Sequence, residues 1–151
     1  MSGLTRAHLL AFMRQERYAV QASVSASGTP QIAVVGVVVS DRFEVFFDTL
    51  DSTRKAANLR RNPAIAMALG PTAEATERTV QLEGTADEPR GDDLQRLLDL
   101  YFDRFPDGRD RQRWPGIMYF RVTPTWLRYS DFSTNPPIVA ELSGGELARL
   151  G

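Results

Sequence analysis

Short apolar runs separated by turn residues dominate the pattern of this chain, and six of them predict β-strands. Alternating or continuous apolar segments bounded by Gly, Pro, Asn, Asp or Ser are typical of strands. The six segments are residues 18–25, 32–39, 43–48, 64–69, 78–86 and 117–129. The second is a nearly continuous β-branched run, so we expect it to be buried on both faces. The polar residues 70–77 are expected to form a loop.

Other segments repeat their apolar residues at the spacing of an amphipathic helix. They are residues 4–15, 53–61 and 92–105, with a weaker pattern at 146–150. The second predicted helix ends at Asn62, because Pro63 disfavours helical geometry in the residue before it.

Two short turns, at Gly28 and Asp41, decide the fold class. The strands that they join must be antiparallel, since parallel strands need a long crossover. The sequence therefore predicts an α+β protein, mainly β, built as a six-stranded antiparallel barrel with flanking helices. No G-x-G-x-x-G motif follows the first strand, which excludes a Rossmann fold. We expect one domain over residues 1–151, with residues 132–151 as a C-terminal tail.

Composition removes several classes of function. The net charge is −1, from 18 basic and 19 acidic residues, so a nucleic acid partner is not expected. The chain has no cysteine, which rules out disulfides and thiolate metal sites. We recognise no signal peptide and no membrane-spanning run, so we expect a cytoplasmic protein without a membrane partner. The single histidine, His8, lies outside every motif, and no metal site is expected.

The segment that carries the most chemistry connects the third predicted strand to the second predicted helix. It places the hydroxyls of Thr49, Ser52 and Thr53 before a basic pair, Arg54 and Lys55. Helix N-terminal amides, hydroxyls and cations together suit a phosphate group. The alternative is ordinary N-capping by Ser52 or Thr53 beside a solvated basic turn.

Three stretches resemble the pyridoxamine 5′-phosphate oxidase-like family of FMN-binding split barrels. The first, residues 45–63, is similar to the family's strand–phosphate-loop–helix signature, and it matches position by position from Thr49 through Thr53, Arg54 and Lys55. The second, residues 78–84, is similar to the family strand Arg-Gln-Val-Arg-x-Glu-Gly. The third, residues 122–131, resembles the last barrel strand of small family members.

This resemblance implies a homodimer that holds two FMN molecules in clefts between its subunits. The phosphate would bind Thr53, Arg54 and Lys55, with Thr49 nearby. The flavin ring would lie along residues 33–36, which include Val35 and Gly36, and Gly36 either lets the backbone approach the ligand or forms a bulge. Two further residues would contribute at the ring or from the partner subunit, namely Gln81 and Trp126.

The sequence also departs from the vitamin B6 oxidases. Their C-terminal Arg-x-His-Arg segment is absent, so pyridoxamine-phosphate oxidase activity itself is not expected. We expect an FMN-dependent oxidoreductase that acts on a small organic substrate, and no catalytic residue is assigned. One alternative is a reductase that uses a deazaflavin such as coenzyme F-420. Another is a non-enzymatic flavin- or haem-related binding protein, with haem disfavoured because iron wants a His or Cys ligand.

Overall fold

The computed structural model describes residues 3–71 and 77–151. Its helices are α1 (Arg6–Gln15), α2 (Arg54–Arg61), α3 (Gly91–Arg104), α4 (Gly108–Arg111) and α5 (Gly144–Ala148). Its strands are β1 (Tyr18–Val24), β2 (Pro30–Gly36), β3 (Val38–Val39), β4 (Val45–Leu50), β5 (Ala64–Leu69), β6 (Arg78–Asp87), β7 (Ile117–Asp131) and β8 (Ile138–Ser143). The loop expected over 70–77 lies mostly outside the described residues.

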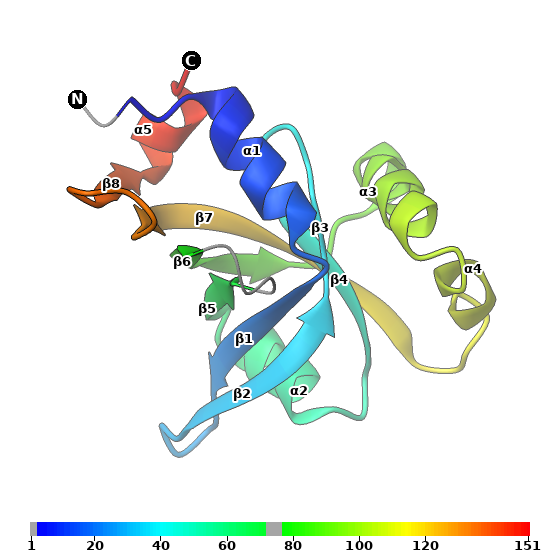
Figure 1. Ribbon diagram of the computed structural model, residues 1–151. Helices are drawn as coiled ribbons and strands as arrows, with labels where there is room; N and C mark the ends of the chain where they lie inside the picture. Colours follow the sequence, from blue (N-terminus) through cyan, green and yellow to red (C-terminus); the bar gives the residue numbers. More distant parts are fainter. Residues whose placement is uncertain (1–2, 72–76) are drawn as a thin grey trace.

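All these strands belong to one antiparallel sheet that curls into a half-barrel (Figure 1). The strand order is β2-β1-β5-β6-β7-β4-β3, and β8 pairs with the outer part of β7. The two ends of the curl approach each other, because β2 contacts β4 although the two are not neighbours in the strand order. The predicted α+β class and antiparallel barrel are therefore confirmed.

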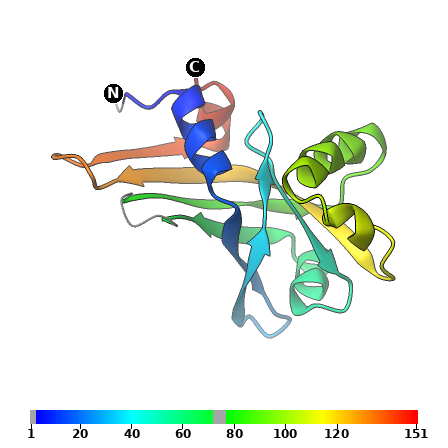
Figure 2. The same cartoon turned by 45° about the vertical axis from the view of Figure 1, so that its right-hand side comes forward.

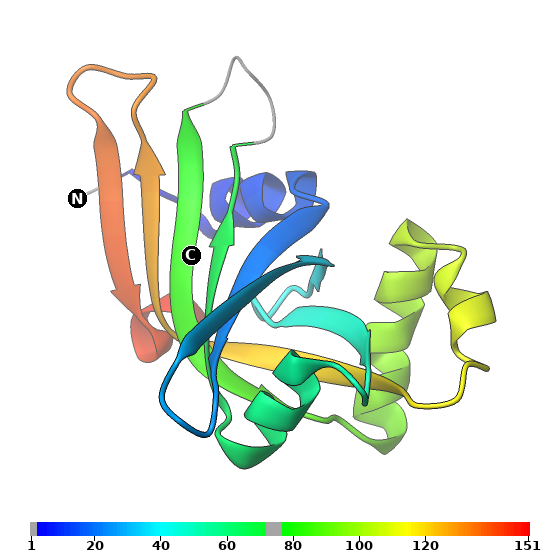
Figure 3. The same ribbon diagram turned by 90° about the horizontal axis from the view of Figure 1, so that it is seen from below.

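The helices lie around this sheet in separate places (Figures 1 and 2). Helices α1 and α5 lie together at one end, where the amide of Arg6 donates to the carbonyl of Gly151 at 2.7 Å. Helices α3 and α4 lie outside β4, over a second apolar cluster that contains Phe46 and Tyr101. Helix α2 packs against β1, beside the β1–β2 hairpin (Figure 3).

The described residues contain eight strands, so the predicted number of six was wrong. The run at 32–39 divides at Val37, whose amide donates to the carbonyl of Arg17 at 3.0 Å instead of continuing the ladder. Beyond it, Val38 and Val39 pair with β4 rather than with β1. The other addition is β8 in the C-terminal tail, which pairs with β7 from Trp126 to Asp131.

The expectation that the 32–39 run is buried on both faces was also wrong. Ile32 is 68% exposed and Val34 is 67% exposed, whereas Val35 and Val37 are buried in the main core. The adjacent strand β1 also turns an apolar side chain outward. Val20 is 39% exposed, whereas the polar residue Gln21 is buried. One face of the β1–β2 hairpin is thus apolar and open.

Pro124 does not interrupt β7, which continues through it to Asp131. The ladder accommodates the proline by a register shift between Glu83 and Gly84 on β6. A Cβ atom at Gly84 would lie 2.5 Å from the carbonyl oxygen of Thr123. Only glycine fits this close approach of two strands.

Candidate functional site

The connection from β4 to α2 brings two threonine hydroxyls together. Thr49 Oγ1 lies 3.0 Å from Thr53 Oγ1. Thr53 is the N-cap of α2, where its hydroxyl accepts from the amide of Ala56 and donates to the carbonyl of Leu50 at 2.9 Å. Because the proton of Thr53 goes to Leu50, Thr49 is the donor of the pair. The N-capping that the sequence offered as the alternative for this segment is present, and Thr53 rather than Ser52 provides it.

The basic pair follows at the first two positions of α2. Arg54 is exposed and Lys55 is half-buried, and neither makes a hydrogen bond or an ion pair through its side chain within the described parts of the chain. Burial lowers the pKa of the Lys55 ammonium, and the negative charge of Asp48 opposes this shift only in part. A partly buried cation that forms no ion pair with a described residue, at a helix N-terminus, is a favourable place for an anion.

A small hollow of about 100 Å³ opens between these cations and the β1–β2 hairpin. Its walls come from Arg54 and Lys55 on α2, from Gln21 and Ser23 on β1, and from residues 31–33 on β2. The structure therefore joins the predicted basic pair to the predicted ring strand. The contribution of β1 was not predicted from the sequence, although the polar residues Gln21 and Ser23 between apolar neighbours were a usable signal.

One side of this hollow is a closed polar network. The amide nitrogen of Asn58 donates to Ser23 Oγ at 3.1 Å and to Gln31 Oε1 at 2.9 Å. Its carbonyl oxygen accepts from Arg61, which also donates to the backbone carbonyl of Val24 at 2.7 Å. These bonds fasten α2 to the hairpin and fix the walls of the hollow.

Val35 and Gly36, at the end of β2, are not among the residues that line the hollow. The side chain of Val35 is buried in the main core and does not line the hollow. A Cβ atom at Gly36 would lie 2.9 Å from Cζ of Phe105. The ring of Phe105 therefore gives a packing reason for glycine at this position.

Gln81 and Trp126 lie on the outer face of the sheet, in a different hollow of about 250 Å³ shared with Val20 and Ala66. Within one chain, the structure does not bring them together with Arg54 and Lys55. The pairing of β2, β1, β5 and β6 places the exposed residues Ile32 and Val34 on the same face of the sheet as Gln81 and Trp126.

An ion pair lies beside the basic pair, on the side of β4 that α4 covers. Arg111 Nε lies 3.0 Å from Asp48 Oδ2, and an Arg111 nitrogen lies 3.4 Å from the hydroxyl of Tyr101. Burial and the charge of Asp48 raise the pKa of Tyr101. Asp48 is thus held by α4 rather than by Lys55.

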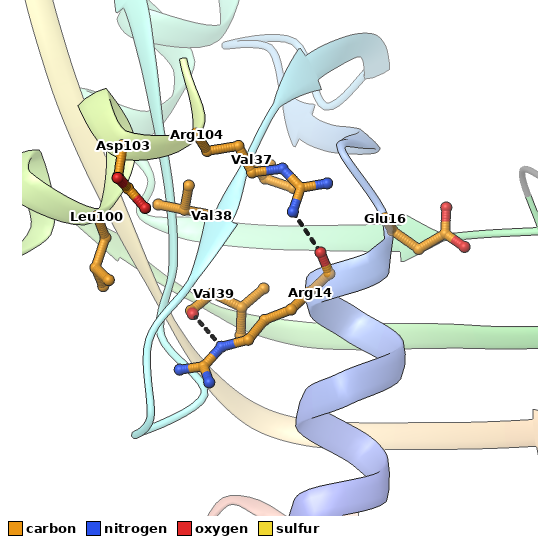
Figure 4. Close-up of a pocket in the computed structure, with 8 residues that line it drawn as sticks. All are labelled: Arg14, Glu16, Val37, Val38, Val39, Leu100, Asp103 and Arg104. Atoms are coloured by element: carbon orange, nitrogen blue, oxygen red, sulfur yellow. Dashed lines mark hydrogen bonds between the residues drawn. The ribbon is translucent and has the colours of Figure 1, made fainter. Parts of the chain in front are cut away.

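Another hollow lies between α1, β3 and α3, and both of its arginines donate hydrogen bonds to backbone carbonyls. Figure 4 shows Arg14 donating to the carbonyl of Val39, at 3.0 Å, and Arg104 donating to the carbonyl of Arg14. The side chain of Glu16 extends away from both (Figure 4). The two arginines tie α1 to β3 and α3, so the hollow is a structural junction.

The described residues contain no group of three or more His, Cys, Asp or Glu side chains placed to hold a metal ion. None of their helices is long and apolar enough to cross a membrane.

Comparison with known proteins identifies one family. The sequence matches the family described as pyridoxamine 5′-phosphate oxidase over residues 5–131. No curated protein matches the chain.

Several solved structures share the fold. A heme binding protein from Mycobacterium smegmatis has a TM-score of 0.79 and 15% identity over 96% of this chain, which spans only 59% of that protein. HutZ, the heme storage protein from Vibrio cholerae, has a TM-score of 0.66 and 19% identity, covering 78% of this chain and 88% of that one. A pyridoxamine 5′-phosphate oxidase-related, FMN binding protein from Nostoc punctiforme has a TM-score of 0.65 and 15% identity, covering 95% and 98%.

Proposed function

The chain belongs to the pyridoxamine 5′-phosphate oxidase family, and from this premise we propose that it binds FMN and acts as an oxidoreductase on a small organic substrate. The proposal rests mainly on the environment of the Lys55 side chain. Its ammonium group is half-buried at the N-terminus of α2, burial lowers its pKa, and it has no hydrogen bond or ion pair among the described residues. A phosphate would supply the missing negative charge.

The residues around Lys55 fit the FMN phosphate. Arg54 offers a second cation, which is exposed, and the first-turn amides of a helix lack intrahelical acceptors. The paired hydroxyls of Thr49 and Thr53 hold this turn in place. Bound FMN would supply hydride and electron transfer. The chain would bind the phosphate, orient the ring along β2 and exclude water.

The proposal includes a homodimer. Ile32, Val34 and Val20 form an exposed apolar face on the hairpin, and the same side of the sheet carries Gln81 and Trp126. A second copy that covered this face would remove the apolar surface from water. It would also give Gln81 and Trp126 a place at the partner's ring site.

Haem is the second candidate, because two structural neighbours are named for it. The only histidine, His8, is exposed on α1 and lines a hollow formed with Arg78 and Tyr129. That hollow shares no residue with the hollow beside Lys55. The residues around Lys55 therefore favour a phosphorylated ligand over an iron porphyrin.

The test is a titration of the purified protein with FMN, followed by absorbance and by flavin fluorescence. Replacing both Arg54 and Lys55 with Ala should weaken FMN binding strongly, because each charge-assisted hydrogen bond contributes roughly 1.5–3 kcal/mol. The matched control is Arg42→Ala with Arg113→Ala, which removes the same charge from exposed positions whose side chains make no hydrogen bond or ion pair among the described residues.

Failure of the wild-type protein to take up FMN would contradict the proposal, as would equal affinity in the Arg54/Lys55 variant. Preferential uptake of a deazaflavin would move the assignment to that cofactor. A haem absorbance band on addition of haem, without FMN uptake, would favour the second candidate.

A further inference from the structure

Gln21 has an unusual position in the hollow beside Lys55. Its side chain is 1% exposed, and its Oε1 atom is buried without any hydrogen-bond partner among the described residues. A buried polar atom without a partner loses its hydrogen bonds to water and gains none in the protein, which destabilises the fold. Buried amides are normally paired, so an unpaired one needs an explanation.

The other strand-borne polar side chains of the hollow are paired. Ser23 and Gln31 both accept from the amide of Asn58. In contrast, Gln21, Arg54 and Lys55 all line the same hollow, and their side chains make no hydrogen bond or ion pair within residues 3–71 and 77–151. The unpaired groups thus include two cations at one end and an amide on the adjacent strand.

We propose that Gln21 is a ligand-specificity residue, whose amide hydrogen-bonds a hydroxyl of the ligand next to its phosphate. This inference rests on the proposed function and identifies the ligand as a phosphorylated polyol chain, as in the ribityl phosphate of FMN. A hydroxyl both donates and accepts, so it suits the amide oxygen as well as the amide nitrogen. A bare inorganic anion on Arg54 and Lys55 would leave Gln21 unpaired.

A substitution of Gln21 by Met separates this role from a structural one. Methionine has a similar length and no amide, so it removes the unpaired group from the free protein and the partner from the ligand. We expect the thermal midpoint of the ligand-free protein to stay unchanged or rise. We expect FMN to bind roughly three- to tenfold more weakly, the loss of one neutral hydrogen bond.

Gln31→Met is the matched control on the neighbouring strand. Gln31 accepts from Asn58 at 2.9 Å, so its loss leaves a donor less well paired and should lower the thermal midpoint. A thermal midpoint of the ligand-free protein that falls in Gln31→Met but not in Gln21→Met would show that the Gln21 amide has no partner in the free protein.

The outcomes separate the two proposals. Absence of FMN binding by the wild-type protein would contradict the proposed function itself. Wild-type binding that weakens in the Arg54/Lys55 variant but not in Gln21→Met would overturn only the role of Gln21. A lower thermal midpoint for both Gln21→Met and Gln21→Leu, including failure of both to fold, would show that the amide supports the fold and would also overturn it.

Discussion

The hydroxyl oxygens of Thr49 and Thr53 lie 3.0 Å apart, one at the end of β4 and the other at the N-cap of α2. This contact joins the last inward-facing residue of the strand to the first turn of the helix. It fixes the direction in which Arg54 and Lys55 leave the sheet. The stability of the helix and the geometry of the anion site therefore depend on the same hydroxyl pair.

Thr53→Ala should destabilise the protein, because the amide of Ala56 loses its acceptor. Loss of such a cap costs about 0.5–2 kcal/mol. Thr53→Ser keeps the hydroxyl and should retain most of the stability. Denaturant unfolding at constant m-value measures the difference, and equal losses in the two variants would show that the methyl group, not the cap, matters.

The pH dependence of FMN binding should report the charge of Lys55. Only the protonated ammonium attracts the phosphate, so affinity is full at neutral pH and falls as pH rises through the pKa of Lys55 in the free protein. Burial lowers that pKa, so the fall should begin below the ordinary lysine value of about 10.4. Lys55→Arg should show no such fall, since arginine stays charged over the whole pH range in which lysine loses its proton. Parallel pH profiles for the two proteins would contradict this role.

The Arg111–Asp48 ion pair should protect Lys55 from Asp48. Arg111→Gln would leave Asp48 without its counter-ion, and the carboxylate would then attract Lys55 away from the phosphate. We expect FMN to bind several-fold more weakly, an effect of about 1 kcal/mol. Adding Asp48→Asn should restore the affinity. A double variant as weak as Arg111→Gln alone would show that α4 acts by packing and not by charge.

Gly36→Ala should destabilise the ligand-free protein. The new Cβ would lie 2.9 Å from the ring of Phe105, which is buried, stacked on Tyr101 with ring centroids 5.0 Å apart, and covered by the guanidinium of Arg17. Such overpacking costs about 1–3 kcal/mol, and Phe105→Leu should recover part of it. An unchanged thermal midpoint with weaker FMN binding would instead indicate that the glycine serves the ligand.

Val34→Glu should convert the proposed dimer to a monomer. Val34 is 67% exposed at the centre of the apolar face of the hairpin, and a carboxylate there would be buried without a partner in the dimer. Val139→Glu on β8 places the same charge on another exposed valine and should leave the dimer intact. Light scattering at micromolar concentration measures both, and a monomeric wild-type protein would refute the dimer.

Local patterns predicted the antiparallel class, most strand positions and the capped start of α2. Turns at Gly28 and Asp41, alternation along β6 and the proline after Asn62 are short-range signals, and they agree with the final structure. The division of the 32–39 run was not predictable in this way. It depends on the bond from Val37 to Arg17 and on the pairing of β3 with β4.

The candidate site also has a part that the sequence predicted and a part that only the tertiary structure shows. Thr53, Arg54 and Lys55 are consecutive, so the sequence alone placed a cap and two cations at one helix N-terminus, because helix geometry is local. Only the tertiary structure decided that Gln21 faces these cations, that Gly36 packs against Phe105, and that Gln81 and Trp126 lie on another face. Those relationships join residues far apart in the chain, and they follow from how the sheet curls and how α2 packs on β1, which local residue patterns do not determine.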